Sequence, residues 1–173
     1  MKTVYILIAS ILILILSGSC RQSPTMAQLS EVDTLLNHEQ QDSADALMKI
    51  IPSSSLTDEE RAYYHLLTTR FQYRRFEVPA DDHLLDSAIS YYNQVHDAEK
   101  LADCYYYKGG MVYERGNARD AILYLKKGET IARMFANKTI VHKIYERLSQ
   151  INRCYKEPDE ALRYARLALQ VSR

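Results

Sequence analysis

The sequence is poor in residues that interrupt helices. Its 173 residues include five glycines and four prolines, and tryptophan is absent. So little glycine and proline argues against a β-rich chain and against a disordered one. An excess of one charge is also missing, because 22 basic residues balance 22 acidic ones. A near-neutral chain without a basic stripe gives no reason to expect nucleic acid or anionic lipid as a partner.

Motifs for catalysis and metal binding are missing as well. The five histidines are scattered over separate segments, and none has the HExxH spacing of a zinc site. The chain contains no GxSxG motif and no glycine-rich phosphate loop. Asp81, Asp82 and His83 could ligate a metal, but acids are also favoured at the start of a helix, which is the preferred interpretation here. We therefore expect no enzyme, no cofactor and no metal.

The N-terminus has the pattern of an export signal. Lys2 precedes an apolar run over residues 4–16, whose thirteen residues span about 20 Å as a helix and fall short of a bilayer core of about 30 Å. Small residues at 17–19 lead to Cys20. This order resembles a bacterial lipoprotein signal, in which a peptidase cuts before the cysteine and a lipid is attached to its sulfur. The bulky residue, Leu16, stands one place earlier than usual, as in relaxed signals of the Bacteroides group.

The resemblance predicts a signal peptide over residues 1–19, lipidation at Cys20 and a tether over residues 20–26. An ordinary cleaved leader and an uncleaved anchor remain the alternatives. No acidic cluster follows Cys20, and such a cluster marks surface export in similar lipoproteins. We therefore expect a lipid-anchored protein of the cell envelope that faces the periplasm.

From residue 27 onward the apolar residues recur mostly at every third or fourth position, which is the helical period. Thr57 and Glu60 have the spacing of a capping box, and Pro158 suits the first turn of a helix. We expect eight helices over residues 27–39, 42–51, 57–76, 82–95, 98–115, 117–134, 138–155 and 158–171.

One pattern recurs along these helices. Residues 105–128 read YYYKGGMVYERGNARDAILYLKKG: an aromatic residue, a small residue four positions later, a tight turn, and then Ala121 with residues four and seven positions beyond it. The same frame begins at Tyr64 and Tyr145, which lie 41 and 40 residues from Tyr105. It resembles the tetratricopeptide repeat, although Lys108 stands where leucine is usual.

The resemblance implies an all-α, right-handed α–α superhelix of about four helix pairs, and more narrowly a tetratricopeptide-repeat lipoprotein of Bacteroides-type bacteria. A plain helical bundle is the alternative. The pairs would cover residues 27–56, 57–97, 98–136 and 137–173, with a weak first repeat and an inserted loop at 77–82. In this register Cys104 and Cys154 lie about 15 Å apart along the helix axis, too far for a disulfide, and we expect both to be buried.

The family's register also predicts which residues line the concave face, where these repeats bind proteins or peptides. Tyrosine and arginine are frequent anchors at such interfaces, but the tyrosines could equally pack between helices. The predicted partner-binding residues are His65, Gln72, Tyr73, Tyr106, Tyr113, Glu146, Gln150 and Arg153.

Architecture and the missing motifs together predict a non-catalytic scaffold that binds a protein or peptide. A sensory or regulatory domain of a membrane signalling or transcriptional system is the alternative. Leu167, Leu169 and Val171 in the last helix would remain uncovered, which favours a truncated array, self-association through this helix or a docked partner.

Overall fold

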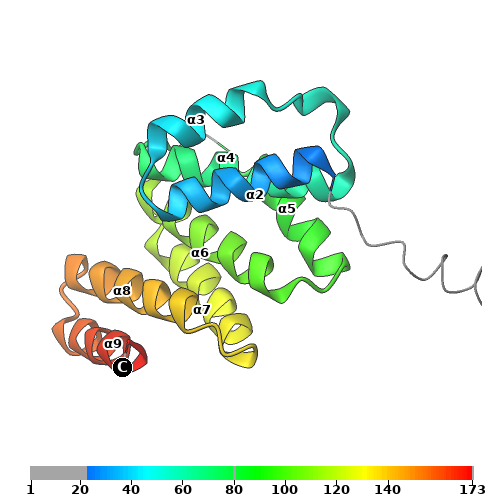
Figure 1. Ribbon diagram of the computed structural model, residues 1–173. Coiled ribbons are helices and arrows are strands. Elements are labelled where there is room, and N and C mark those ends of the chain that lie inside the picture. Colours follow the sequence, from blue (N-terminus) through cyan, green and yellow to red (C-terminus); the bar gives the residue numbers. More distant parts are fainter. Residues whose placement is uncertain (1–22, 80, 173) are drawn as a thin grey trace, which may run out of the picture.

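The computed structural model describes residues 23–79 and 81–172, so the predicted signal peptide and Cys20 lie outside the described residues. Within this part the chain forms helices and no strand (Figure 1). A short 3-10 turn at Ser53–Ser55 precedes the third of them. The α-helices are α2 (Pro24–Asn37), α3 (Gln41–Ile50), α4 (Asp58–Arg74), α5 (His83–Gln94), α6 (Ala98–Glu114), α7 (Ala118–Met134), α8 (Lys138–Cys154) and α9 (Pro158–Val171).

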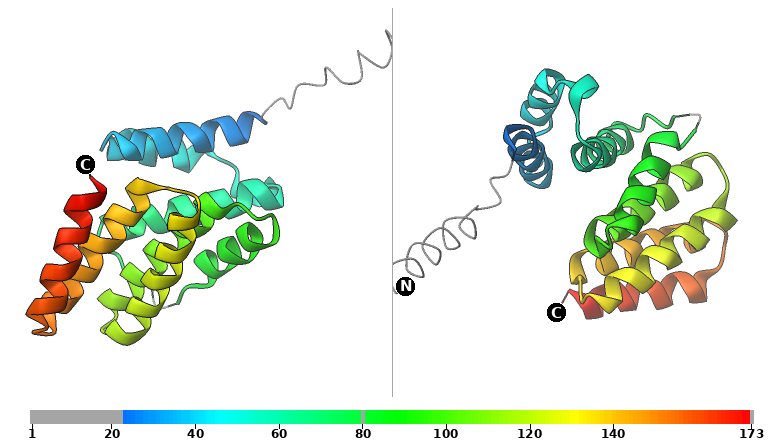
Figure 2. Two further views of the ribbon diagram at one scale, coloured as in Figure 1. Left: turned by 90° about the horizontal axis from the view of Figure 1, so that it is seen from below. Right: turned by 90° about the vertical axis from the view of Figure 1, so that its right-hand side faces the viewer.

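Consecutive helices pack as four pairs: α2 with α3, α4 with α5, α6 with α7, and α8 with α9. The first helix of each pair also contacts the first helix of the next, so α2, α4, α6 and α8 form a continuous series. The pairs follow one another from the N-terminal helices to α9 (Figure 2). This arrangement confirms the expected all-α repeat array, in which stacked pairs share a core that no pair could bury alone.

The first helix starts earlier than predicted. The Ser23 hydroxyl accepts a hydrogen bond from the Met26 backbone N–H at 2.9 Å, and Pro24 occupies the first helical turn, where no N–H is needed. The predicted tether to residue 26 is therefore wrong in its last three residues. The capping box before α4 is confirmed, because Thr57 and Glu60 satisfy each other's backbone N–H groups at 2.9 and 3.3 Å.

In the described parts of the chain, six of the seven connections between α-helices contain a residue in the left-handed backbone conformation. This conformation lets the chain leave a helix while the last carbonyls still find donors, and glycine adopts it without steric cost. Only one of the six residues in these turns is a glycine. They are Glu39, Phe76, His96, Gly116, Ala136 and Lys156, with φ between 53° and 87°.

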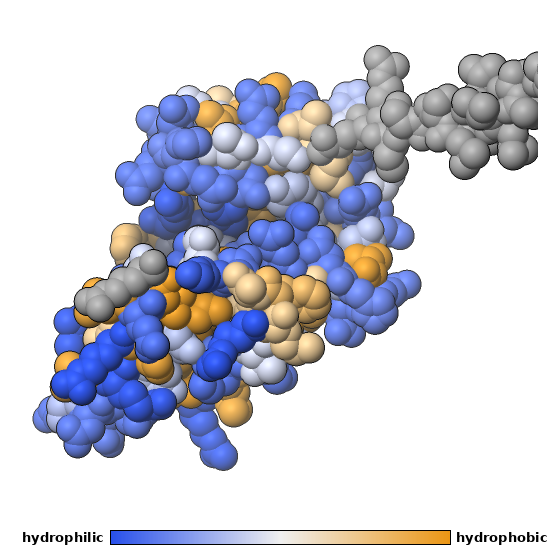
Figure 3. All heavy atoms as spheres, turned by 60° about the horizontal axis from the view of Figure 1, so that its bottom comes forward, coloured by the Kyte–Doolittle hydropathy of each residue, from blue (hydrophilic) through white to orange (hydrophobic). Residues whose placement is uncertain are grey.

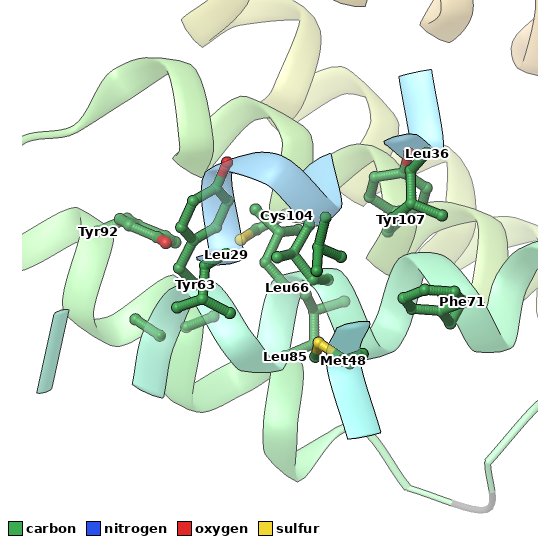
Figure 4. Close-up of a cluster of buried hydrophobic side chains, with 14 of the residues drawn as sticks. Leu29, Leu36, Met48, Tyr63, Leu66, Phe71, Leu85, Tyr92, Cys104 and Tyr107 are labelled. Carbon is green, nitrogen blue, oxygen red and sulfur yellow. The ribbon is translucent and has the colours of Figure 1, made fainter. Parts of the chain in front are cut away.

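The interior is divided into two neighbouring apolar clusters. The first joins the N-terminal helices to α6, and Figure 4 shows Leu66 of α4 and Tyr63 beside Leu29 of α2 and Cys104 of α6. The second lies between α6, α7, α8 and α9 and includes Ile144. Because α6 contributes to both, it is the helix through which the two halves of the array are joined.

The small residues of the repeat are required by close helix packing. A Cβ atom on Gly109 would lie 2.6 Å from Cγ of Leu125 and 3.1 Å from the Ala121 carbonyl oxygen. In the last pair Ser149 takes the equivalent place, and its hydroxyl donates to the Ala161 carbonyl at 2.8 Å. The recurring small residues therefore mark where the two helices of a pair touch.

Lys108, the departure from the repeat pattern, is buried. Its ammonium group is ion-paired with Asp86 of α5 and lies 4.7 Å from the ring centroid of Tyr124 in α7. A lysine can replace the usual leucine here because its stem packs like an apolar chain while its charge finds partners on two other helices.

The two described cysteines are free thiols in different surroundings. Cys104 is buried in α6 as predicted, and this burial raises the pKa of its thiol. Cys154 is exposed, so the prediction for it was wrong. It is the last residue of α8, where the chain turns towards solvent beside Tyr113.

Two substitutions test the role of the left-handed turn residues. Nothing lies within 4 Å of a Cβ added to Gly116, so Gly116→Ala introduces only backbone strain and should lower the free energy of unfolding by about 1 kcal/mol. Ala136→Gly relieves the same kind of strain and should raise the free energy of unfolding by roughly 0.5–1 kcal/mol. Urea denaturation measures both, and changes of the same sign would contradict the assignment.

Candidate functional site on the inner face

The first helices of all four pairs surround one hollow of about 210 Å³, which we call the inner hollow. Hydrophilic side chains border the recess between the N-terminal helices and the C-terminal helices in Figure 3. The lining is mostly polar, unlike the apolar clusters on either side. It consists of Asp33 and Asn37 of α2, Arg70 of α4, Glu99 and Asp103 of α6, and Asn137, Thr139, Ile140 and Lys143 in and before α8.

One wall of the inner hollow is a hydrogen-bonded network around buried Arg70. One guanidinium nitrogen, Nη1, donates to Asp33, and Nη2 donates to Oδ1 of Asn37 at 2.8 Å. The second oxygen of Asp33 accepts from the Tyr63 hydroxyl at 2.6 Å. Burial and this carboxylate raise the pKa of Tyr63, so the hydroxyl stays protonated as a donor. The network neutralises its own charges and ties α2 to α4.

The opposite wall carries two charged groups without direct partners. Asp103 of α6 and Lys143 of α8 make no hydrogen bond or ion pair with the residues that the structure describes. Burial raises the pKa of Asp103 to about 6 and lowers the pKa of Lys143. Removal of a charged group from water is the main cause of both shifts, and the charge of each group on the other opposes them in part.

The rim adds one more acid. Glu99 is exposed, and its carboxylate accepts a hydrogen bond from the Asn137 amide at 3.4 Å. The lining therefore holds three carboxylates against two basic groups, so the inner hollow is slightly acidic when all of them are ionised.

Aromatic side chains continue the inner face beyond the hollow. Tyr73 of α4 lies across Gly110 of α6, where a Cβ atom would come within 2.5 Å of the Tyr73 ring. Its ring centroid is 6.3 Å from that of Tyr106, and the Arg147 guanidinium of α8 lies 5.2 Å from it. Burial raises the pKa of Tyr106 to about 12. Three first helices thus meet at one ridge of half-buried tyrosine.

Only two of the predicted partner-binding residues lie on this ridge, namely Tyr73 and Tyr106. His65 lies instead near Leu84 at the start of α5, where burial lowers the pKa of its imidazole. Gln72 borders a separate hollow of about 130 Å³ beside the same part of α5. His65 and Gln72 therefore lie outside the inner hollow, and their role in binding stays a prediction.

The remaining predicted residues lie towards the C-terminal pair. Tyr113 contacts Cys154, which raises the pKa of its hydroxyl to about 12. Glu146 is exposed and lies 3.3 Å from His142. With Gln150 and Arg153 it borders a groove of about 380 Å³ between α8 and α9. Their role in binding stays a prediction.

The charged residues of the inner hollow were missed in the sequence. A signal for one of them was present, because Asp103 precedes Tyr106 by three positions and residues at that spacing share a helix face. Arg70 and Lys143 gave no such signal, since their contacts are with other helices.

Asp81, Asp82 and His83 have partners that explain their presence at the start of α5. The Asp82 carboxylate is ion-paired with Arg115 at 2.6 Å, and Asp81 accepts from the His83 backbone N–H at 3.3 Å. Across residues 23–79 and 81–172, no cluster of three or more histidine, cysteine or acidic side chains is arranged to hold a metal. None of the described helices is long and apolar enough to cross a membrane.

A scan against protein-family models found no match, and comparisons with curated proteins and with solved structures found none either. The resemblance to tetratricopeptide repeats therefore depends on this chain's own residues and helix pairing.

The unpaired carboxylate of Asp103 should cost stability in the free protein. Because its pKa is raised in the folded state, the cost is absent below the unfolded value near pH 4 and is complete above about pH 6. Asp103→Asn should therefore raise the free energy of unfolding at pH 7.5 by about 1–2 kcal/mol, after allowance for partial exposure, and by much less at pH 4.

The matched control is Glu31→Gln, which removes a carboxylate from an exposed position of α2. Urea denaturation at the two pH values measures both variants. An equal effect of Asp103→Asn at both pH values would show that the carboxylate carries no burial cost.

Proposed function

We propose that this protein is a non-catalytic, tetratricopeptide-like scaffold that binds a protein or peptide on its inner face while a lipid on Cys20 holds it in the cell envelope. The observation that carries the binding proposal is the meeting of all four first helices around one polar hollow. A surface assembled from every repeat suits an extended ligand, which can contact successive helices along its length.

The chemistry of the inner face supports a polypeptide ligand. Half-buried Tyr73 and Tyr106 offer flat apolar area with little conformational entropy to lose, which is why tyrosine is frequent in interfaces. Unpaired Asp103 and Lys143 beside them provide charges that a complementary ligand could pair. Such groups contribute to specificity because a ligand without the matching charge leaves them unsatisfied.

The anchor proposal is supported by the start of the fold. Ser23 is held against the body by its hydroxyl, which donates to the Glu60 carboxylate of α4. Cys20 is only three residues earlier in the sequence, a reach of about 10 Å. A lipid on that cysteine would keep the helical array directly beside the membrane, and we propose the periplasmic side.

A sensory or regulatory role is the second candidate, and the surface of the last pair favours it. Leu169 of α9 is 63% exposed and Leu162 is 50% exposed. Another groove of about 420 Å³ is bordered by Val141, Leu167 and Val171. Figure 3 shows apolar side chains gathered near this end of α9. A signalling partner or a second copy of the chain would gain apolar contact here.

Cys20→Ala tests the anchor. The variant should move from the membrane fraction to the soluble fraction, because the lipid has no other attachment point in this proposal. Metabolic labelling with a fatty-acid analogue should mark the natural chain and not the variant. A variant that remains membrane-bound would contradict lipidation as the anchor.

Site-specific photocrosslinking tests the binding face. A photoreactive amino acid at Tyr106 should crosslink a discrete protein partner in intact cells, because this position lies between two first helices. The control position is Leu123 of α7, which is 54% exposed on a second helix. Identical products from both positions, or products from Leu123 alone, would show that the inner face is not the binding surface.

A further inference from the structure

We infer that the inner hollow receives the cationic side chain of a partner segment, an ammonium or guanidinium group that pairs with Asp103. This inference rests on the proposed function and names the chemistry that the binding face selects.

The charge balance of the hollow favours a cation. Three carboxylates face two basic groups, and one of those basic groups, Arg70, already gives its two Nη groups to Asp33 and Asn37. Asp103 is therefore left without a hydrogen-bond donor among the described residues. A guest cation would pair directly with Asp103, which otherwise has only the through-space charges of Lys143 and Arg70, in a site shielded from water where such pairing is stronger than at an open surface.

An anion would fit less well. It would have to approach Asp103 and Glu99, and among the described residues that line the hollow its basic donors are Lys143 and the single unpartnered Nε of Arg70. The amide oxygens of Asn37 and Asn137 already accept from Arg70 and from the Ile140 backbone N–H, and each keeps a second lone pair that a cation can use. Lys143 instead competes with a guest cation, because its charge acts on the same carboxylate.

The surroundings favour a side chain of a polypeptide over a free amine. Tyr106 follows Asp103 by three residues on α6, and Tyr73 continues the same face on α4. A segment whose lysine or arginine enters the hollow would lay its neighbouring residues on these rings. A free amine would gain nothing from them.

The test uses the full-length chain in detergent micelles and an NMR titration with three probes. The probes are the tripeptide acetyl-Gly-Lys-Gly-amide, the same tripeptide with uncharged norleucine in place of lysine, and the free diamine 1,5-diaminopentane. The lysine peptide should bind at least about tenfold more tightly than the norleucine peptide, because only it can pair with the carboxylate. It should also bind more tightly than the diamine.

Variants assign the effect to the hollow. Asp103→Asn should weaken binding of the lysine peptide by about tenfold or more, whereas Glu31→Gln removes the same charge outside the hollow and should leave it unchanged. Lys143→Gln should strengthen binding, because it removes the competing ammonium. A merely structural role of Asp103 would not produce opposite effects from these two neighbouring residues.

The pH dependence is a further signature. The charged groups that face Asp103 are Asp33, Arg70, Glu99 and Lys143, and burial raises the pKa of Asp103 to about 6. Protonation removes the charge that holds the guest, so affinity should fall roughly tenfold between pH 7.5 and pH 5. In Asp103→Asn this dependence should be lost.

Three outcomes would overturn the inference: equal binding of lysine and norleucine peptides, no shift of resonances from residues around the hollow with any probe, or tighter binding of the diamine. A negative result here together with crosslinks from Tyr106 would reject the cationic guest and leave the scaffold proposal standing. Loss of the Tyr106 crosslinks would reject both.

Discussion

The close contact between the two helices of a pair governs how all the other helices pack. At Gly109 the backbones of α6 and α7 approach so closely that even a methyl group would collide with Leu125. This approach leaves the larger side chains of α6 free to fill the spaces towards α4 and α8, where they form the two apolar clusters. One side of each such helix contacts its pair partner closely, and the other carries the large side chains that pack against neighbouring pairs. The stacking of pairs, and with it the inner face, follows from this division.

Charged groups inside the array are used in two different ways. Lys108 and Arg70 are buried but have partners on neighbouring helices, so they connect helices at a modest net cost. Asp103 and Lys143 carry the cost of burial without direct partners, and they lie in the hollow that all four pairs share. A stability cost of this kind is expected where a protein keeps groups ready for a ligand.

Much of the fold could be predicted because its signals are local. The helical period, the capping box at Thr57 and the proline that begins α9 each depend on residues within one turn, and all three were confirmed. The failures have a different origin. Ser23 caps a helix whose apolar pattern begins only later, and Cys154 is exposed because α8 ends there. The structure places His65 and Gln72 beside α5, and their role in binding stays a prediction.

The helices, their pairing and the positions of close contact can be deduced from local sequence, since small residues and apolar spacing act over short distances. The set of polar side chains that share one hollow depends on how the helices pack. Asp33, Arg70, Asp103 and Lys143 come from four helices, and their separations depend on the rotation and crossing of each helix. Those angles result from the packing of many side chains at once, so no single stretch of the chain encodes them.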